Sequence, residues 1–358
     1  MQVDVPGRMR SLELIDTQAG GDVSRIVVGG VGPLPGGSVR EQLRFLERHG
    51  DGLRRLLLSE PYGDPAMSVN LIVEPGHPEA QAGYIIMEAM GYPLYSGSNT
   101  ICTATAVLES GRIPMREGVQ DVVLESPAGL ARITATVVDG RVTSITTRGE
   151  PAYVASRDRF VEVPGYGRVG YDGVWSGAFF ALVDATAAGF ELTRAEEPAL
   201  AAFGDAFVRA VRPEFLEVHP HLGEVGPLPF VHFCGPIEQV SEEGFRSRSA
   251  TYVHPGVICR SPTGTGTSAR LARMYERGDV AQGQWLDTIS PRDSSFRGTV
   301  LGTAAVGHHR GLDTHITGRA WTLAHSRTVI DLDDPMVDSS DLEHLLPGPT
   351  PLVPGASG

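Results

Sequence analysis

Short runs of apolar and β-branched residues recur along the chain between glycine- and proline-rich turns, and this pattern predicts many short strands. In the first half, we expect strands at 12–15, 26–28, 68–73, 82–88, 122–125, 131–138 and 142–146. Asp139-Gly140 lies between the last two of these and is typical of a two-residue hairpin turn. Leucine and valine repeat near helical spacing over 38–54, which predicts an amphipathic helix there.

The second half repeats this arrangement. Strands are expected at 153–163, 178–183, 229–233, 249–253, 314–323 and 327–331, with a strand pair over 292–303. A helix is expected over 196–211, because Leu200, Phe203, Phe207 and Val211 lie along one face. The predicted fold class is therefore α+β, in two related halves. We expect a first lobe of 8–151 plus 314–340, a second lobe of 152–313, and a disordered, proline- and glycine-rich tail over 346–358.

Two stretches of small residues are each expected to begin a helix: Ser96-Gly97-Ser98-Asn99-Thr100 and Thr263-Gly264-Thr265-Gly266-Thr267. Each opens on a hydroxyl residue, and a glycine that is typical of a helix end follows fifteen positions later. A helix N-terminus presents unpaired N–H groups and a partial positive charge. Two such ends facing each other would therefore bind a carboxylate, although ordinary helix capping by Ser and Thr is the alternative interpretation.

The net charge and the cysteine, histidine and apolar content of the chain exclude several classes of function. The net charge of −13 argues against a nucleic-acid surface, since phosphate binding needs clustered Lys and Arg. The three cysteines lie far apart without a CxxC pair, which predicts a reduced protein without disulfides or a zinc cage. His219 and His221 have no third ligand at a defined spacing, so no metal site is predicted. No stretch approaches a membrane span and no signal peptide is evident at the start, so we expect a cytoplasmic protein.

Several motifs, taken in order, resemble those of the proline racemase superfamily. DTQAGGDVSR over 16–25 is similar to the family's opening DTHTGGEPTR, and EPYG over 60–63 is similar to its EPRG loop. YPLYSGSNTI over 92–101 resembles the first catalytic motif, and RSPTGTGTSA over 260–269 resembles the second. The resemblance extends over about 12–331 and implies the diaminopimelate epimerase-like fold. In that fold, two pseudo-symmetric lobes each wrap a curved, mostly antiparallel sheet around a central helix, with the site in the cleft between them.

The resemblance places Ser96 and Thr263 where racemases of this family carry two cysteines, one on each face of the substrate α-carbon. One thiolate removes the α-proton there, and the other thiol returns a proton to the opposite face. An aliphatic hydroxyl is a far weaker acid than a thiol, so symmetric racemisation by two thiols is excluded. Threonine at the second position resembles the branch that dehydrates trans-3-hydroxy-L-proline. The chain is thus identified as a divergent Ser/Thr member, with Ser96 and Thr263 as the predicted catalytic residues.

Two further positions depart from the family, in which a histidine and an aspartate contact the ring nitrogen of the substrate. These positions hold Ser98 and Cys259, so specificity for a proline-like amine loses its usual partners. Backbone contacts to the carboxylate need no particular side chain and are retained. Cys259 is interpreted either as an ionisable group of the site or as a small residue that fills the space of the aspartate. The predicted substrate-binding residues are Gly97, Ser98, Asn99, Cys259, Gly264 and Thr265.

Three functions remain open at this point. The first is a cofactor-independent lyase that dehydrates trans-3-hydroxy-L-proline or a related β-hydroxy amino acid, with Ser96 as acid and base and Thr263 opposite. The second is a proline- or hydroxyproline-type epimerase or racemase acting on a different substrate, through Cys259 or an unidentified side chain. The third is a non-catalytic homologue that binds a small carboxylate. The resemblance implies no cofactor and no metal, a small carboxylate as the ligand, and a homodimer as the common assembly.

Overall fold

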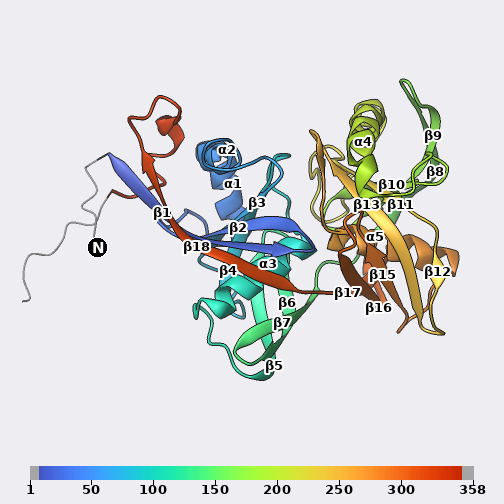
Figure 1. Cartoon of the computed structure of the whole chain (residues 1–358), viewed down its shortest axis with the longest axis horizontal. Helices are drawn as coiled ribbons and strands as arrows, with labels where there is room; N and C mark the ends of the chain where they lie inside the picture. The colour runs from blue at the N-terminus through green and yellow to red at the C-terminus, as the bar shows by residue number, and fades with distance from the viewer. Residues whose placement is uncertain (1–7, 349–358) are drawn as a thin grey trace, which may run out of the picture.

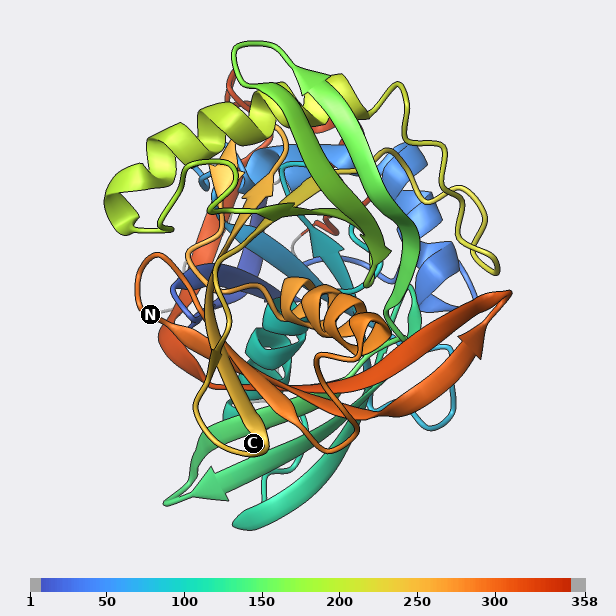
Figure 2. The ribbon, with the colours of Figure 1, turned by 90° about the vertical axis from the view of Figure 1, so that its right-hand side faces the viewer.

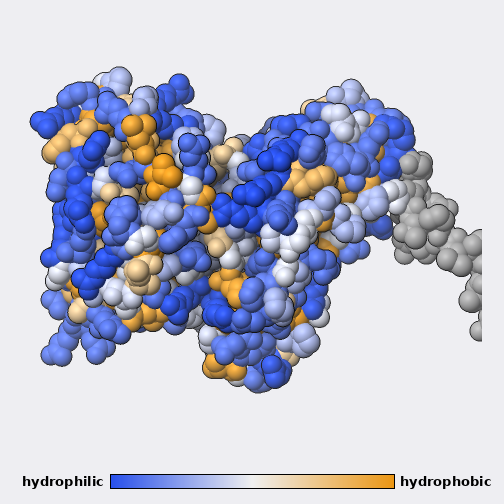
Figure 3. Space-filling model, turned by 180° about the vertical axis from the view of Figure 1, so that it is seen from behind, coloured by the Kyte–Doolittle hydropathy of each residue, from blue (hydrophilic) through white to orange (hydrophobic). Residues whose placement is uncertain are grey.

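The computed structural model describes residues 8–348 and shows two lobes beside each other (Figure 1). The first lobe contains β1 (Met9–Ala19), β2 (Asp22–Gly29), α1 (Val39–His49), α2 (Asp51–Leu57), β3 (Ser68–Val73), β4 (Ala82–Met87), α3 (Gly97–Glu109), β5 (Gly118–Ser126), β6 (Gly129–Val138) and β7 (Arg141–Arg148). Seen from behind, the space-filling view shows two mainly hydrophilic masses with a notch between them (Figure 3).

The second lobe follows without a break in the chain. It contains β8 (Tyr153–Val163), β9 (Gly167–Trp175), β10 (Phe179–Asp184), η1 (Arg194–Glu196), α4 (Glu197–Val211), β11 (Phe230–Cys234), β12 (Glu238–Gln239), β13 (Gly244–Val253), β14 (Val257–Ile258), α5 (Gly264–Arg277), β15 (Trp285–Ile289), β16 (Ser295–Val306) and β17 (His309–Gly318). β18 (Ala320–Asp331) then returns to the first lobe and pairs antiparallel with β1, and η2 (Ser339–Asp341) follows.

Strand pairing has the same order in both lobes. In the first lobe, β1–β2 is antiparallel, β2–β3 parallel, β3–β4 antiparallel and β4–β5 parallel, and β5–β6–β7 is antiparallel. In the second lobe, β9–β10, β10–β11, β11–β13, β13–β15 and β15–β16–β17 repeat this series. Because β17 also pairs with β7, the lobes share one continuous ladder. The prediction of an α+β fold in two pseudo-symmetric, mostly antiparallel halves is confirmed.

Each lobe is built around one central helix. Every residue of α3 from Gly97 to Leu108 is buried, which explains why, apart from Asn99, this helix is apolar or hydroxyl-bearing on all sides. α5 is buried from Gly264 to Ala272, although Arg270 lies within that stretch. The Arg270 guanidinium is satisfied by the carbonyl oxygens of Arg248 and Gly235. The two predicted central helices therefore hold fixed positions inside the sheets.

Several element predictions were wrong in detail. The strand pair expected over 292–303 is a single strand, β16, which pairs with β15 and β17, and the strand expected over 327–331 is the end of β18. The helix expected over 38–54 ends at His49 and restarts at Asp51, because Gly50 leaves the helical region with φ −144° and ψ 16°. The strand expected over 314–323 is two strands, since β17 ends at Gly318 and β18 begins at Ala320. The break separates the strand that pairs with β16 from the strand that pairs with β1.

The lobe boundaries at 151, 152, 313 and 314 stay a prediction. Of the predicted disordered tail, residues 349–358 lie outside the described part of the chain. Leu346, where that tail was expected to begin, is fully buried, and its carbonyl oxygen accepts a hydrogen bond from Arg10 Nε at 2.8 Å. Among residues 8–348, no helix is both long and apolar enough to cross a membrane.

Candidate active site

The two helix starts singled out in the sequence face each other between the lobes. α3 begins at Gly97 after the N-cap Ser96, and α5 begins at Gly264 after the N-cap Thr263. A Cβ atom on Gly97 would lie 3.3 Å from the Cα atom of Gly264, so the two helix starts are in direct contact. Figure 2 shows α5 in front of α3 at the centre of the molecule, with strands around them. The approach is this close because neither residue has a side chain.

A pocket opens beside this contact and is lined by both lobes. Of the eight predicted site residues, six line it: Ser96, Ser98, Asn99, Cys259, Thr263 and Thr265. The other two, Gly97 and Gly264, form the contact between the helix starts instead. Apolar side chains complete the wall, among them Met67 and Tyr95 from the first lobe and Phe230, Val253 and Val257 from the second. The structure therefore brings together residues that are more than 160 positions apart in the sequence.

Three hydrogen-bond donors fix the side-chain oxygen of Asn99. Asn99 is buried, with 2% of its surface exposed. Its Oδ1 accepts hydrogen bonds from Ser24 Oγ at 3.0 Å, Ser68 Oγ at 2.6 Å and Asn70 Nδ2 at 3.0 Å. These donors lie on β2 and β3, which fixes the first turn of α3 on the sheet.

The other end of the Asn99 amide points to the pocket side. Its Nδ2 donates to Ser96 Oγ at 3.0 Å and to Glu88 Oε1 at 2.9 Å. The Ser96 oxygen thus acts as an acceptor, and its own hydrogen is free for Ser98 Oγ, 3.3 Å away, or for a ligand. Ser96, Ser98 and Glu88 are therefore oriented around one corner of the pocket.

Asp22 and Glu88 are the two pocket carboxyl groups, and sequence reasoning did not select them. Burial, with a smaller contribution from the charge of Asp22 and against the hydrogen bond from Asn99, raises the pKa of Glu88 to about 7. Burial also raises the pKa of Asp22, against hydrogen bonds from Ser261 and from the N–H of Arg260, 2.6 Å away. Asp22 lies within the motif over 16–25 and Glu88 follows β4, but neither position alone indicated a site.

The Cys259 thiol is kept in its neutral form. Burial and then the charge of Asp22 raise its pKa well above that of an ordinary thiol. A neutral thiol is a proton donor and a weak nucleophile. The structure therefore places Cys259 in the pocket wall as a possible acid and not as a resting thiolate.

Thr263 combines backbone strain with an unsatisfied hydroxyl. Its φ of +66° and ψ of 109° are rare for a β-branched residue. Its Oγ1 is buried and has no hydrogen-bond partner among the described residues. Strained residues with unpaired polar atoms concentrate at functional sites, and this one lines the pocket.

Replacing Thr263 by glycine is expected to leave the free energy of unfolding within about 1 kcal/mol of the wild type, because relief of backbone strain offsets the lost side-chain burial and the added chain entropy. The matched change T267G is expected to cost about 2–3 kcal/mol, since it adds glycine inside the helix and removes buried hydrogen bonds. The Thr267 hydroxyl lies 3.0 Å from Thr263 O and 2.6 Å from Thr288 Oγ1. Urea unfolding compares the two, and equal losses would contradict a functional origin of the strain.

Three other polar residues, Glu60, Asp293 and His232, do not line the pocket. Glu60 is exposed in a turn, and Asp293 is exposed and pairs with Arg248 at 2.6 Å. His232 is fully buried beside Gly266, where its Nδ1 lies 2.8 Å from Thr251 Oγ1. Within residues 8–348, no three His, Cys, Asp or Glu side chains are grouped to hold a metal ion.

Known proteins resemble this chain over most of its length. The sequence profile described as proline racemase matches residues 14–339. A protein of Chromohalobacter salexigens is 55% identical over 94% of this chain and 93% of the relative. The 4-hydroxyproline 2-epimerase of Agrobacterium fabrum is 35% identical over 92% of this chain and 94% of the relative. A crystal structure of a hydroxyproline epimerase from Agrobacterium vitis, with bound trans-4-OH-L-proline, matches with a TM-score of 0.85 and 32% identity, over 92% and 94% of the two chains.

Fold and site together define a two-lobed α+β protein of the diaminopimelate epimerase-like class, with a pocket at the starts of two central helices. With the profile and the relatives above, the chain belongs to the proline racemase family. Membership supports an isomerase-type enzyme related to proline and hydroxyproline epimerases.

Proposed function

We propose that this protein is a cofactor-independent epimerase that inverts the α-carbon of a small imino or amino carboxylate of the hydroxyproline class. The observation that carries the proposal is the meeting of two helix N-termini at one pocket, which also contains two carboxyl groups and a thiol. The dehydration of trans-3-hydroxy-L-proline, preferred from the sequence, becomes the second candidate, because the named relatives are epimerases.

The helix starts would bind the carboxylate of the substrate. The first N–H groups of a helix have no acceptor within it, and they carry the positive end of the helix dipole. In α3, the first intrahelical bond is from Thr100 N to Ser96 O, and in α5 it is from Thr267 N to Thr263 O. In α3 the Asn99 N–H is already capped by Ser96 Oγ at 3.5 Å. The N–H groups of Gly97 and Ser98, together with those at the start of α5, are thus left for an anion beside Ser98 and Thr265.

The substrate nitrogen would be held by a carboxylate from the first lobe. The sequence indicated that Ser98 and Cys259 cannot replace the family's histidine and aspartate as partners for a cationic nitrogen. Asp22 and Glu88 line the same pocket and supply negative charge there. An amino or imino acid, with one positive and one negative group, therefore fits the pocket better than a simple carboxylate.

A specific observation keeps the dehydratase as the second candidate. The two faces of the pocket are chemically unequal, since Glu88 and Ser96 lie on one side and Cys259 and Thr263 on the other. Elimination needs one base at the α-carbon and a proton donor for the leaving hydroxyl. The unpartnered Thr263 hydroxyl would suit that donor position.

An NMR panel of proline, 3-hydroxyproline and 4-hydroxyproline isomers in D2O separates the candidates. Epimerisation is expected to place deuterium at the α-carbon and to form the second diastereomer without loss of water. Dehydration would instead give a cyclic imine that is trapped by aminobenzaldehyde. Thermal stabilisation by a panel compound without exchange or elimination would contradict both and support a binding protein.

A further inference from the structure

We propose that Glu88 is the general base of the first lobe and takes the α-proton at the position served by a thiol elsewhere in the family. This inference rests on the proposed function and deepens it. It starts from geometry, because Glu88 lines the pocket and shares a hydrogen-bond donor with Ser96. Ser96 itself stands where the thiol is expected, and its hydroxyl is too weak an acid for this exchange.

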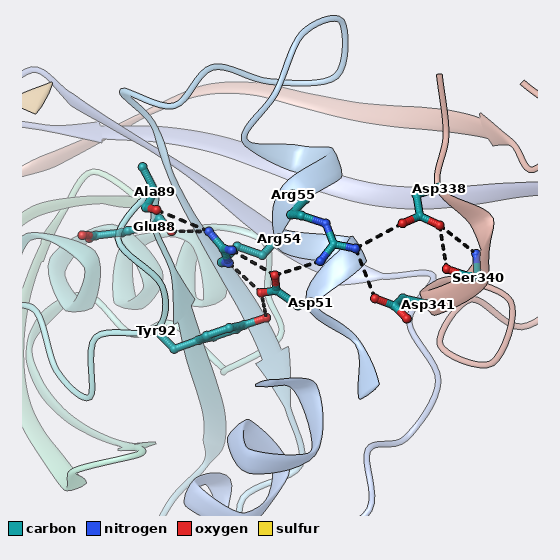
Figure 4. Close-up of polar contacts among 9 residues, drawn as sticks. All are labelled: Asp51, Arg54, Arg55, Glu88, Ala89, Tyr92, Asp338, Ser340 and Asp341. Atoms are coloured by element: carbon teal, nitrogen blue, oxygen red, sulfur yellow. Dashed lines mark hydrogen bonds and ion pairs between the residues drawn. The ribbon is translucent and has the colours of Figure 1, made fainter. Parts of the chain in front are cut away.

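The backbone of Glu88 is held in place by a network outside the pocket (Figure 4). Arg54 Nη1 donates to the carbonyl oxygens of Glu88 at 3.1 Å and Ala89 at 3.4 Å. The Arg54 guanidinium is in turn fixed by both Asp51 carboxylate oxygens, at 2.7 and 2.9 Å, and Tyr92 donates to Asp51 at 3.0 Å. Figure 4 shows the Glu88 carboxyl group pointing away from Arg54. The network therefore positions the residue without neutralising its side chain.

The carboxyl group is oriented through one oxygen only. Oε1 accepts the hydrogen bond from Asn99 Nδ2 at 2.9 Å, and no hydrogen bond to Oε2 occurs within residues 8–348. The same Nδ2 reaches Ser96 Oγ, so the carboxyl lies beside the first-lobe catalytic position. Oε2 is thus left for a proton of the substrate.

The charged and titratable groups around Glu88 favour a proton-exchanging carboxyl. Asp22 faces it from β2, and the Cys259 thiol faces it from the second lobe. Arg54 on α2 contacts only its backbone oxygen. Partial burial and the like charge of Asp22 raise the pKa of Glu88 to about 7, which suits a group that must both accept and release a proton near neutral pH.

Glu88, Cys259 and the two helix N-termini are sufficient for a reaction in which every proton is accounted for. The Glu88 carboxylate takes the α-proton, and the electron pair of the C–H bond moves into the substrate carboxylate, whose added negative charge faces the helix N-termini. The Cys259 thiol then gives its proton to the opposite face of the α-carbon and becomes a thiolate. Exchange with solvent moves one proton from Glu88 back to Cys259, which restores the enzyme.

The test is E88Q, which keeps the shape of the side chain and an oxygen for Asn99. We expect α-deuterium exchange of the best compound in the panel to fall by roughly 10²–10⁴-fold. In the wild type, kcat/KM should rise through about pH 7 as Glu88 loses its proton, and then level off. E88Q should lose this rise, whereas E88D should retain it at a lower rate. Thermal stabilisation of E88Q by the same compound should persist, because the helix starts still bind its carboxylate.

A matched control is E125Q, which removes a buried carboxylate of the same lobe outside the pocket. Glu125 Oε2 accepts hydrogen bonds from Gly76 N at 2.6 Å and His77 N at 2.8 Å. E125Q should keep the wild-type rate of α-deuterium exchange and the rise of kcat/KM near pH 7. Exchange by E88Q at more than a third of the wild-type rate, with the rise intact, would overturn the base assignment and leave the proposed function standing. Silence of the wild type on the whole panel would instead overturn the proposed function, and the base assignment with it.

Discussion

Replacement of Asn99 by leucine is expected to lower the free energy of unfolding by about 3–5 kcal/mol and to abolish turnover, because it leaves several buried polar groups without partners. Asn99 is 2% exposed and bonds five side chains in the structure. Ser24 and Ser68 still have each other at 2.7 Å, but Asn70 Nδ2 and the Glu88 carboxyl lose their contacts. Ser96 loses its orientation as well. Urea unfolding and exchange of the best panel compound measure the two effects.

The control for N99L is T105V on the same helix. Thr105 is also fully buried, and its hydroxyl donates only to the Ile101 carbonyl oxygen at 2.9 Å. That carbonyl keeps its helical partner, so T105V is expected to cost no more than about 1 kcal/mol and to retain activity. Equal losses in the two variants would show that Asn99 is no more than an ordinary buried polar residue.

Much of the architecture was accessible from the sequence, because it follows from local patterns. Short apolar and β-branched runs between turns predicted most strands, and the matched Ser/Thr starts and glycine ends at Gly111 and Gly278 indicated two equivalent central helices. These features depend on neighbouring residues only. The break at Gly50 and the division at Arg319 were not predicted, because the apolar pattern continues across both positions.

The chemistry of the pocket was less accessible, because it depends on residues that only the fold brings together. Asp22 comes from the start of β2 and accepts a hydrogen bond from Arg260 N of the second lobe, 238 positions away. Glu88 becomes significant only through its neighbours Asn99 and Asp22 and through burial. A sequence shows none of these distances. The hydroxyl positions Ser96 and Thr263 were found by motif, but the adjacent acid and base candidates were not.

The position of Glu88 and Cys259 beside the two helix starts changes the role that these helix starts have. In thiol members of the family, each helix start supplies a proton-transferring group of its own. Here Ser96 and Thr263 hold those positions, while beside them lie the Glu88 carboxyl, with a pKa raised to about 7, and the neutral Cys259 thiol. The helix starts then bind and orient the substrate, and their close approach becomes the feature on which affinity depends.

Replacement of Gly97 by valine is expected to lower kcat/KM by at least about 100-fold, because it separates the two helix starts; a displacement near 1 Å is enough for such a loss. The Cβ alone would lie 3.3 Å from Gly264 Cα, and the valine methyl groups extend further. G97A needs a shift of only a few tenths of an ångström, so its kcat/KM should stay within about tenfold of the wild type. Steady-state kinetics on the best panel compound, with thermal unfolding as a check of folding, provide the measurement.

The double variant G97A/G264A gives the sharper form of this prediction. A Cβ on Gly264 would also lie 3.3 Å from Gly97 Cα, and 3.1 Å from Ile316 Cγ2, so the two new methyl groups compete for one space. Substitutions in direct contact are not additive, and we expect the double variant to lose more activity than the product of the single losses, by a coupling of about 1 kcal/mol or more. Strictly additive losses would mean that the helix starts do not rely on their mutual contact, and the carboxylate site would then have to be formed by one helix alone.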